Sequence, residues 1–133
     1  MRASSRRLVV VVAGAFAIAF GLATIASGGT ALFGGAAARA AVGDAVGFVL
    51  WFNFLAGFAY VATGAGLLMR RAAAARLAAL IAGATLLVFA AFGIHVLLGG
   101  AYEMRTVAAM ILRSLAWVAI AAVARFGAGD AQA

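Results

Sequence analysis

The chain contains no cysteine and no proline, and its 133 residues include one histidine and three acidic side chains. The lack of cysteine excludes disulfides, thiolate metal sites, thiol nucleophiles and thioether-linked haem. The lack of proline means that no helix is kinked by proline. One histidine excludes bis-histidine haem within a single chain. His95 and Glu103 together would supply two zinc ligands where at least three are needed, so no metal site is expected.

Charged residues are also scarce, at 10% of the chain, whereas 68% of the residues are hydrophobic and the mean hydropathy is +1.21. Soluble domains are about 25% charged and about 45–50% apolar. No charged residue occurs in 8–38, 45–69 or 77–102. Because a helix needs roughly 20 apolar residues to cross the hydrocarbon, each run is long enough to span a bilayer. These runs predict an all-α integral membrane protein.

The chain is expected to form one transmembrane domain, 1–133, with four helices. Their predicted ranges are 8–27, 45–69, 77–98 and 106–124. The connection 28–44 is rich in Gly and Ala and too short to span, so it is expected at the outer interface as a short helix or a partly re-entrant loop. Asp44 stands where an N-cap would open the next helix.

The arginines are grouped at the ends of the apolar runs. One end carries seven of them, Arg2, Arg6, Arg7, Arg70, Arg71, Arg76 and Arg125, and the other carries Arg39 and Arg105. The positive-inside rule assigns the seven-arginine end to the cytoplasm. We therefore expect a four-helix up-down antiparallel bundle in the inner membrane with both termini cytoplasmic. The net charge of +7 is explained by this topology, and nucleic acid is not expected as a partner.

The N-terminus also has features of a signal peptide. Ser5-Arg6-Arg7 resembles a twin-arginine signal, and Ala38-Arg39-Ala40 has the A-x-A form of a cleavage site. However, the apolar run 8–27 is longer than the 7–15 residues of a typical signal core. An uncleaved membrane anchor is therefore expected.

Three strongly polar residues lie inside the predicted spans: Asn53, His95 and Arg113. Such residues are costly in a membrane and are the first candidates for function. At about 1.5 Å per residue they lie roughly 12, 6 and 11 Å below the outer ends of their helices. All three thus belong to the outer half of the bilayer and could converge in a bundle.

Helical spacing predicts which faces point inward. One stripe of the second span carries Asn53, Gly57, Tyr60 and Gly64. The glycines on it would allow a partner backbone to approach closely. In the fourth span Trp117 follows Arg113 by four residues, in position for a cation–π contact.

One hypothesis is a polar pocket open to the outer side. Its predicted lining is Asn53, Tyr60, His95, Tyr102, Glu103 and Arg113, with Trp117 beside Arg113. Arginine supplies a fixed charge, Asn and Tyr supply donors, and His can change charge near neutral pH. This chemistry suits the headgroup of a membrane lipid or a quinone.

The run from His95 to Gly99, followed by Tyr102-Glu103, resembles the H-x3-G and acid–tyrosine pattern of succinate dehydrogenase membrane anchors. The resemblance covers about ten residues and implies quinone chemistry, although the acid and the tyrosine differ from that family in order and spacing.

Each of these residues also has a structural interpretation. Asn53 could form an interhelical hydrogen bond, and Arg113 could neutralise Glu103 or extend to the headgroups. His95 could be a packing residue, and Glu103 with Arg105 could form a solvated turn.

The leading functional hypothesis follows from the absence of any catalytic constellation and the small extramembrane mass. It is a non-enzymatic accessory subunit, or a component of a homo-oligomer or larger membrane complex, since many Gly and Ala favour helix association. The pocket is the alternative. The two are distinguished by whether Asn53, His95 and Arg113 face one cavity.

Overall fold

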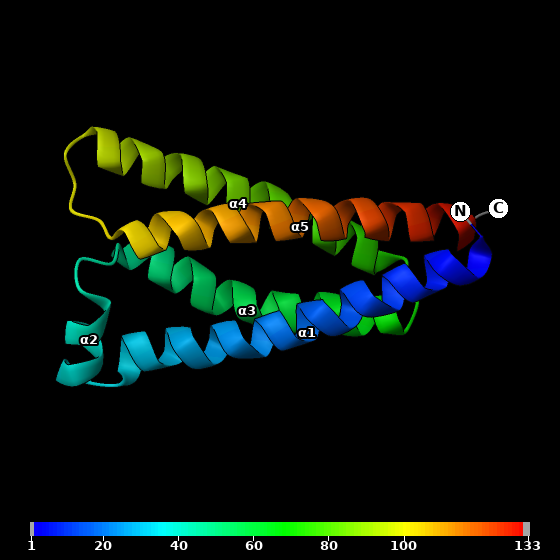
Figure 1. Cartoon of the computed structure of the whole chain (residues 1–133), viewed down its shortest axis with the longest axis horizontal. Coiled ribbons are helices and arrows are strands. Elements are labelled where there is room, and N and C mark those ends of the chain that lie inside the picture. The colour runs from blue at the N-terminus through cyan, green and yellow to red at the C-terminus, as the bar shows by residue number, and fades with distance from the viewer. Residues whose placement is uncertain (1, 132–133) are drawn as a thin grey trace.

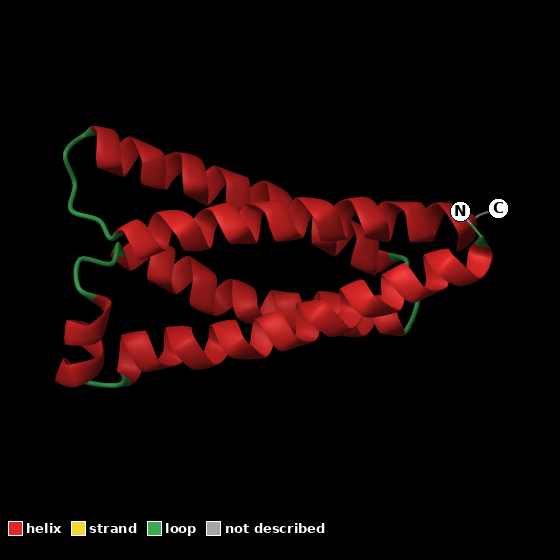
Figure 2. Ribbon diagram, viewed as in Figure 1, coloured by secondary structure: helices red, strands yellow, loops and turns green. Residues whose placement is uncertain are grey.

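The computed structural model describes residues 2–131, with side chains as far as Gly127, and this part of the chain contains helices and loops but no strand (Figures 1 and 2). The helices are α1 (Ala3–Phe33), α2 (Ala36–Val42), α3 (Gly47–Leu68), α4 (Ala73–Leu97) and α5 (Met104–Ala131). All except α2 are long and apolar enough to cross a membrane. The predicted all-α class with four apolar spans is confirmed.

The exterior of the long helices is apolar. On α4, Leu80, Leu87 and Leu97 are 69%, 72% and 86% exposed. Exposure of such a surface to water is energetically unfavourable, whereas lipid tails are as apolar as these side chains. The exposed leucines therefore agree with a membrane as the surrounding solvent.

A seam of small residues joins α1 to α3. The buried residues of α1 recur at alternating steps of three and four: Gly14, Ala17, Gly21, Thr24, Gly28 and Ala31. Gly14 lies opposite Gly64 and Gly21 opposite Gly57, so α1 and α3 run in opposite directions. A Cβ on Gly21 would stand 2.7 Å from the Gly57 carbonyl oxygen. The prediction that Gly57 and Gly64 admit a neighbouring backbone is confirmed.

Helix α1 continues beyond the predicted end at residue 27 to Phe33, so the assignment of 28–44 to a single connection is corrected. Gly28 does not break the helix, because it packs against Phe54 on α3. The helix stops at Gly34 and Gly35, where Gly35 adopts φ +89°. The rest of the segment contains α2, so of the two predicted forms of this connection, a short helix or a re-entrant loop, the structure has the short helix.

The fourth predicted span, 106–124, is also longer at both ends, because α5 extends from Met104 to Ala131.

Two helices end in the same backbone motif. After α4, the Gly99 N–H bonds to the Val96 carbonyl and the Gly100 N–H to the His95 carbonyl, with Gly99 at φ +84°. This is a Schellman cap, in which glycine normally occupies the left-handed position. After α3 the same pattern forms with Arg70, at φ +55°, in that position. An arginine there is strained where glycine would not be.

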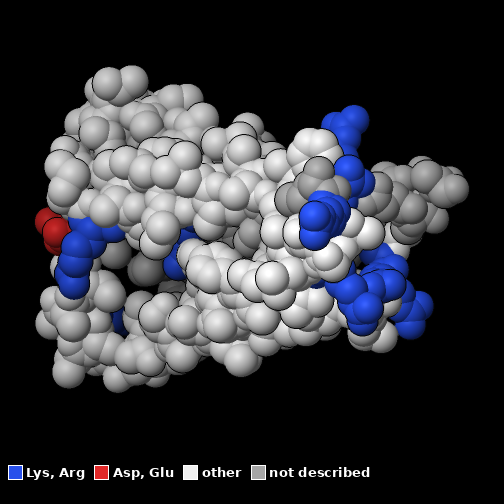
Figure 3. Space-filling view, turned by 45° about the vertical axis from the view of Figure 1, so that its right-hand side comes forward, with Lys and Arg blue, Asp and Glu red and all other residues white. Residues whose placement is uncertain are grey.

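Charge is divided between the two ends of the molecule. The start of α1, the α3–α4 connection and the end of α5 lie at one end, and α2 and the α4–α5 connection lie at the other (Figure 1). Figure 3 shows most of the basic side chains in view at the first end, and the acidic ones in view, with a few basic ones beside them, at the second. This distribution agrees with the arginine grouping expected from the sequence.

Candidate functional site

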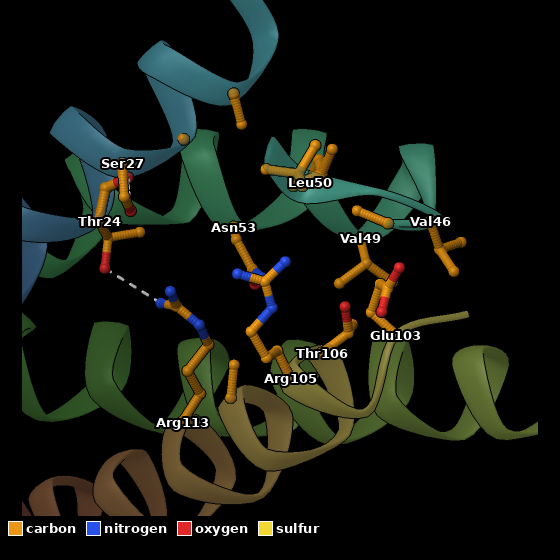
Figure 4. A pocket seen from close by; sticks show the side chains of 15 residues that line it. Thr24, Ser27, Val46, Val49, Leu50, Asn53, Glu103, Arg105, Thr106 and Arg113 are labelled. Atoms are coloured by element: carbon orange, nitrogen blue, oxygen red, sulfur yellow. Dashed lines mark hydrogen bonds between the residues drawn. The ribbon is translucent and has the colours of Figure 1, made fainter. Parts of the chain in front are cut away.

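A partly open cavity of about 290 Å³ lies at the end of the molecule that carries α2, between α1, α3, the first half of α5, and the end of α2 with the loop that follows it (Figure 4). No side chain of α4 lines it. Its polar lining consists of Thr24, Ser27, Asn53, Glu103, Arg105, Thr106 and Arg113. The remaining lining residues are small or aliphatic, so the cavity has both polar and apolar walls.

Arg113 reaches from α5 toward α1 and α3. Its Nη1 donates to Thr24 Oγ1 at 3.1 Å and, more weakly, to the Tyr60 hydroxyl at 3.4 Å. Its guanidinium carbon lies 5.1 Å from the Phe20 ring centroid and 6.0 Å from that of Tyr60. The Nε is buried and has no hydrogen-bond partner among the described residues. The side chain is half-buried and lines the cavity.

No carboxylate among the described side chains pairs with Arg113, so its charge is not neutralised in the way that an ion pair with Glu103 would provide. A charged arginine at the centre of a span costs about 2.5–3.5 kcal/mol on insertion scales. Two hydroxyl acceptors and two aromatic faces offset part of that cost. The Nε hydrogen stays without an acceptor among the described residues.

Asn53 points into the cavity from α3 (Figure 4). Its Oδ1 is buried and has no hydrogen-bond partner in the described part of the chain. The interhelical hydrogen bond proposed as its structural role is therefore not made by this oxygen. A buried amide oxygen without a partner costs about 1–3 kcal/mol.

At the end of the cavity next to α2, hydrogen bonds join segments that are distant in the sequence. Glu103 Oε1 accepts the Asp44 backbone N–H at 2.8 Å, and Arg105 Nη2 donates to the Ala41 carbonyl at 2.9 Å. The turn is exposed, as expected, but it also contacts Ala41 of α2 and Asp44 of the α2–α3 connection. Gly43, at φ +59°, leaves no room for a Cβ beside the Glu103 carboxylate. Asp44 does not cap α3 as predicted, because the helix begins after Val46 with no side-chain cap.

His95 and Tyr102 lie outside the cavity lining. The His95 Nε2 is hydrogen-bonded to the Ala101 carbonyl at 2.9 Å, and the ring packs edge-on against Phe48 with centroids 6.3 Å apart. Tyr102 packs edge-on against Phe92 at 6.1 Å. His95 therefore has the environment of a packing residue at the end of α4. Asn53, His95 and Arg113 do not face one cavity, so the condition set for the three-residue pocket is not met, and the cavity is lined by Asn53 and Arg113 without His95.

Trp117 is fully buried and packs on the Tyr60 ring, with centroids 4.6 Å apart. In the described part of the chain, Arg113 makes its cation–π contacts with Phe20 and Tyr60, so the predicted Arg113–Trp117 contact is replaced. Trp117 packs against the Tyr60 ring, and the Tyr60 hydroxyl accepts a hydrogen bond from Arg113. The structure thus places Asn53, Glu103 and Arg113 in the cavity lining, whereas Tyr60 and Trp117 are buried outside it.

Sequence reasoning missed several lining residues: Thr24, Ser27, Arg105 and Thr106. Thr24 was detectable, because it lies three residues after Gly21 on the small-residue stripe of α1. Arg105 was not, because a charge at a helix end is typical of topology and its contact with Ala41 depends on the folded loop.

The fold and the cavity define an all-helical protein with four helices capable of crossing a membrane. No protein-family model matches the chain, and neither a curated protein nor a solved structure is significantly similar to it. Among the described residues, no group of three His, Cys, Asp or Glu side chains could hold a metal ion. The function must therefore be inferred from the cavity itself.

Proposed function

We propose that this chain is a multi-pass inner-membrane protein that binds the polar head of a membrane-soluble ligand, a lipid headgroup or a quinone, in the cavity between α1, α3 and α5. In this proposal the four spans form an up-down antiparallel bundle with both termini in the cytoplasm. The cavity then opens in the outer half of the bilayer. The concentration of arginines at the opposite end supports this orientation (Figure 3).

The observation that carries the proposal is the position of Arg113. It is a half-buried guanidinium within a membrane span, its Nε lacks a partner among the described residues, and it lines a cavity. Ionisable residues at such depth mark sites of function more often than surface charges do. Asn53 on the facing helix lines the same cavity and is a second strongly polar residue in this part of the span.

The size and lining of the cavity indicate what part of a ligand it holds. At about 290 Å³ it is just below the range of about 300–1,000 Å³ typical of ligand pockets, so it accommodates a headgroup and not a whole amphiphile. The polar groups of α5 face an apolar wall that includes Val49 and Leu50. A polar head together with the first apolar carbons attached to it matches these two walls. No covalent chemistry is required, and the proposed role is binding.

The test is purification in mild detergent followed by mass spectrometry of the co-eluting lipids and quinones. The wild-type protein should retain a specific amphiphile, and Arg113→Leu should fold normally and lose it. Arg125→Leu is the matched control, because it removes an exposed arginine from the other end of the same helix. A protein that carries only bulk lipid, in the same proportions in all three forms, would refute the proposal.

A second candidate, a component of an oligomer or larger membrane complex, is favoured by the outer face of α4. A Cβ added at Gly83 would meet nothing within 4 Å, and Ala79, four residues before it, is also exposed. Small residues at this spacing let another helix approach closely. Native mass spectrometry should show an assembly that Gly83→Leu dissociates. A monomer in both proteins would leave this role without support.

A further inference from the structure

Two guanidinium groups line the cavity and neither is paired with a carboxylate among the described side chains. Arg113 donates to the hydroxyls of Thr24 and Tyr60, and Arg105 donates to a backbone carbonyl. Glu103 is the one acidic side chain in the lining, and its Oε1 accepts the Asp44 N–H. Two positive charges and one negative charge give the lining a net charge of +1.

The two arginines project from one wall at different depths. They are eight residues apart on α5, which corresponds to about 12 Å along the helix axis. Figure 4 shows both side chains extending from α5 into the cavity, with Asn53 entering from α3 on the facing side. The positive charge is thus spread along the cavity wall, from the first turn of α5 to the level of Thr24.

Resting on the proposed function, we infer that the occupant is the phosphate group of an anionic phospholipid. Guanidinium groups bind phosphate oxygens through short, charge-assisted and often bidentate hydrogen bonds. A phosphate would neutralise the surplus positive charge of the lining. A neutral quinone offers carbonyl acceptors but leaves that charge uncompensated, which is costly in a medium of low dielectric.

The apolar wall favours a lipid over a free phosphate ion as the source of this group. Val46, Val49 and Leu50 line the cavity opposite the arginines. A free ion would leave these side chains against water, whereas the glycerol and acyl carbons of a lipid would cover them. The cavity also lies between membrane-spanning helices, where lipid is the more abundant neighbour.

The test uses the full chain in nanodiscs of phosphatidylcholine, to which phosphatidylglycerol, a short-chain quinone or inorganic phosphate is added. Native mass spectrometry counts the bound molecules, and a thermal unfolding curve verifies the fold. Phosphatidylglycerol should bind in preference to phosphatidylcholine, whose choline cation the arginines repel. Arg113→Gln should weaken that binding at least about tenfold, the range expected when a charged hydrogen-bonding partner is lost. Arg125→Gln, with the same loss of charge on the same helix, should not.

If Arg113→Gln fails to fold, Arg105→Gln at the exposed mouth should weaken phosphatidylglycerol binding in the same direction. Binding of inorganic phosphate that equals that of the lipid, and depends on Arg113, would overturn the lipid source. Quinone binding in preference to phosphatidylglycerol would overturn the inference while leaving the proposed function intact. Retention of no added amphiphile would defeat both.

Discussion

Arg113 and Thr24 are joined by a hydrogen bond of 3.1 Å that connects α5 to α1, although the two residues are 89 positions apart in the chain. The threonine hydroxyl lies on the small-residue seam of α1, where only 3% of its residue surface is exposed. The bond therefore links the cavity wall on α5 to the tightly packed α1–α3 pair. Loss of this hydrogen bond should lower the free energy of unfolding and change the position of Arg113 in the cavity wall.

Thr24→Val keeps the shape of the side chain but removes the acceptor from Arg113. We expect the free energy of unfolding to fall by about 1.5–3 kcal/mol, because the bond involves a charged donor. Thr63→Val is the control, since the Thr63 hydroxyl donates to the Ala59 carbonyl of its own helix, which is an uncharged group. Denaturation in mixed detergent micelles measures both, and equal losses would argue against a special role for Thr24.

Two glycine substitutions should change stability in opposite directions. In Gly21→Ala the new Cβ would stand 2.7 Å from both the Gly57 carbonyl oxygen and Val61 Cγ2. Because the carbonyl belongs to a helix backbone, α1 and α3 must separate, at a cost of about 1–3 kcal/mol. In Gly83→Ala the Cβ meets nothing within the chain, so the gain in helix propensity should stabilise the monomer by up to about 1 kcal/mol. Thermal unfolding of the two variants decides the matter, and destabilisation by both would contradict this packing.

Arg70→Gly should raise the free energy of unfolding by about 1 kcal/mol, because glycine occupies the left-handed conformation without the strain of a side chain. Arg71→Gly removes the same charge one position later, where φ is not positive, and should not stabilise. The comparison separates backbone strain from charge. Equal effects in the two variants would show that charge alone is responsible.

Glu103→Ala should open the α2–α3 connection, because the Asp44 N–H loses its acceptor. Hydrogen exchange at that amide should accelerate about fivefold, which corresponds to roughly 1 kcal/mol for an exposed hydrogen bond. Glu103→Gln retains a carbonyl oxygen and should exchange nearly as slowly as the wild type. If both variants exchange at the wild-type rate, the contact is not formed in the membrane.

Topology reporters test the proposed orientation. Fusions after Arg71 and at the C-terminus should report the cytoplasm, and fusions near Arg39 and Arg105 should report the outside, as the arginine distribution requires. An external C-terminus would mean an odd number of spans.

The number and approximate positions of the four spans could be predicted from sequence, because the hydrocarbon thickness and the helical rise together set a minimum apolar length. The close approach at Gly57 and Gly64 was also predictable, since helical spacing places both on one face. The continuation of α1 through Gly28 was not. A pair of glycines is typical of a helix end, and only the neighbouring Phe54 shows why the helix persists there.

For the site, the sequence by itself determined which residues would be costly in a membrane: Asn53 and Arg113 were identified by chemistry alone, and both line the cavity. The tertiary structure decided their partners. In the folded chain Arg113 donates hydrogen bonds to Thr24 and Tyr60, and His95 packs against Phe48 at the end of α4. Spacing along one helix fixes which side chains share a face, but the rotation and separation of neighbouring helices depend on packing along their whole length. Contacts between helices are therefore properties of the folded chain.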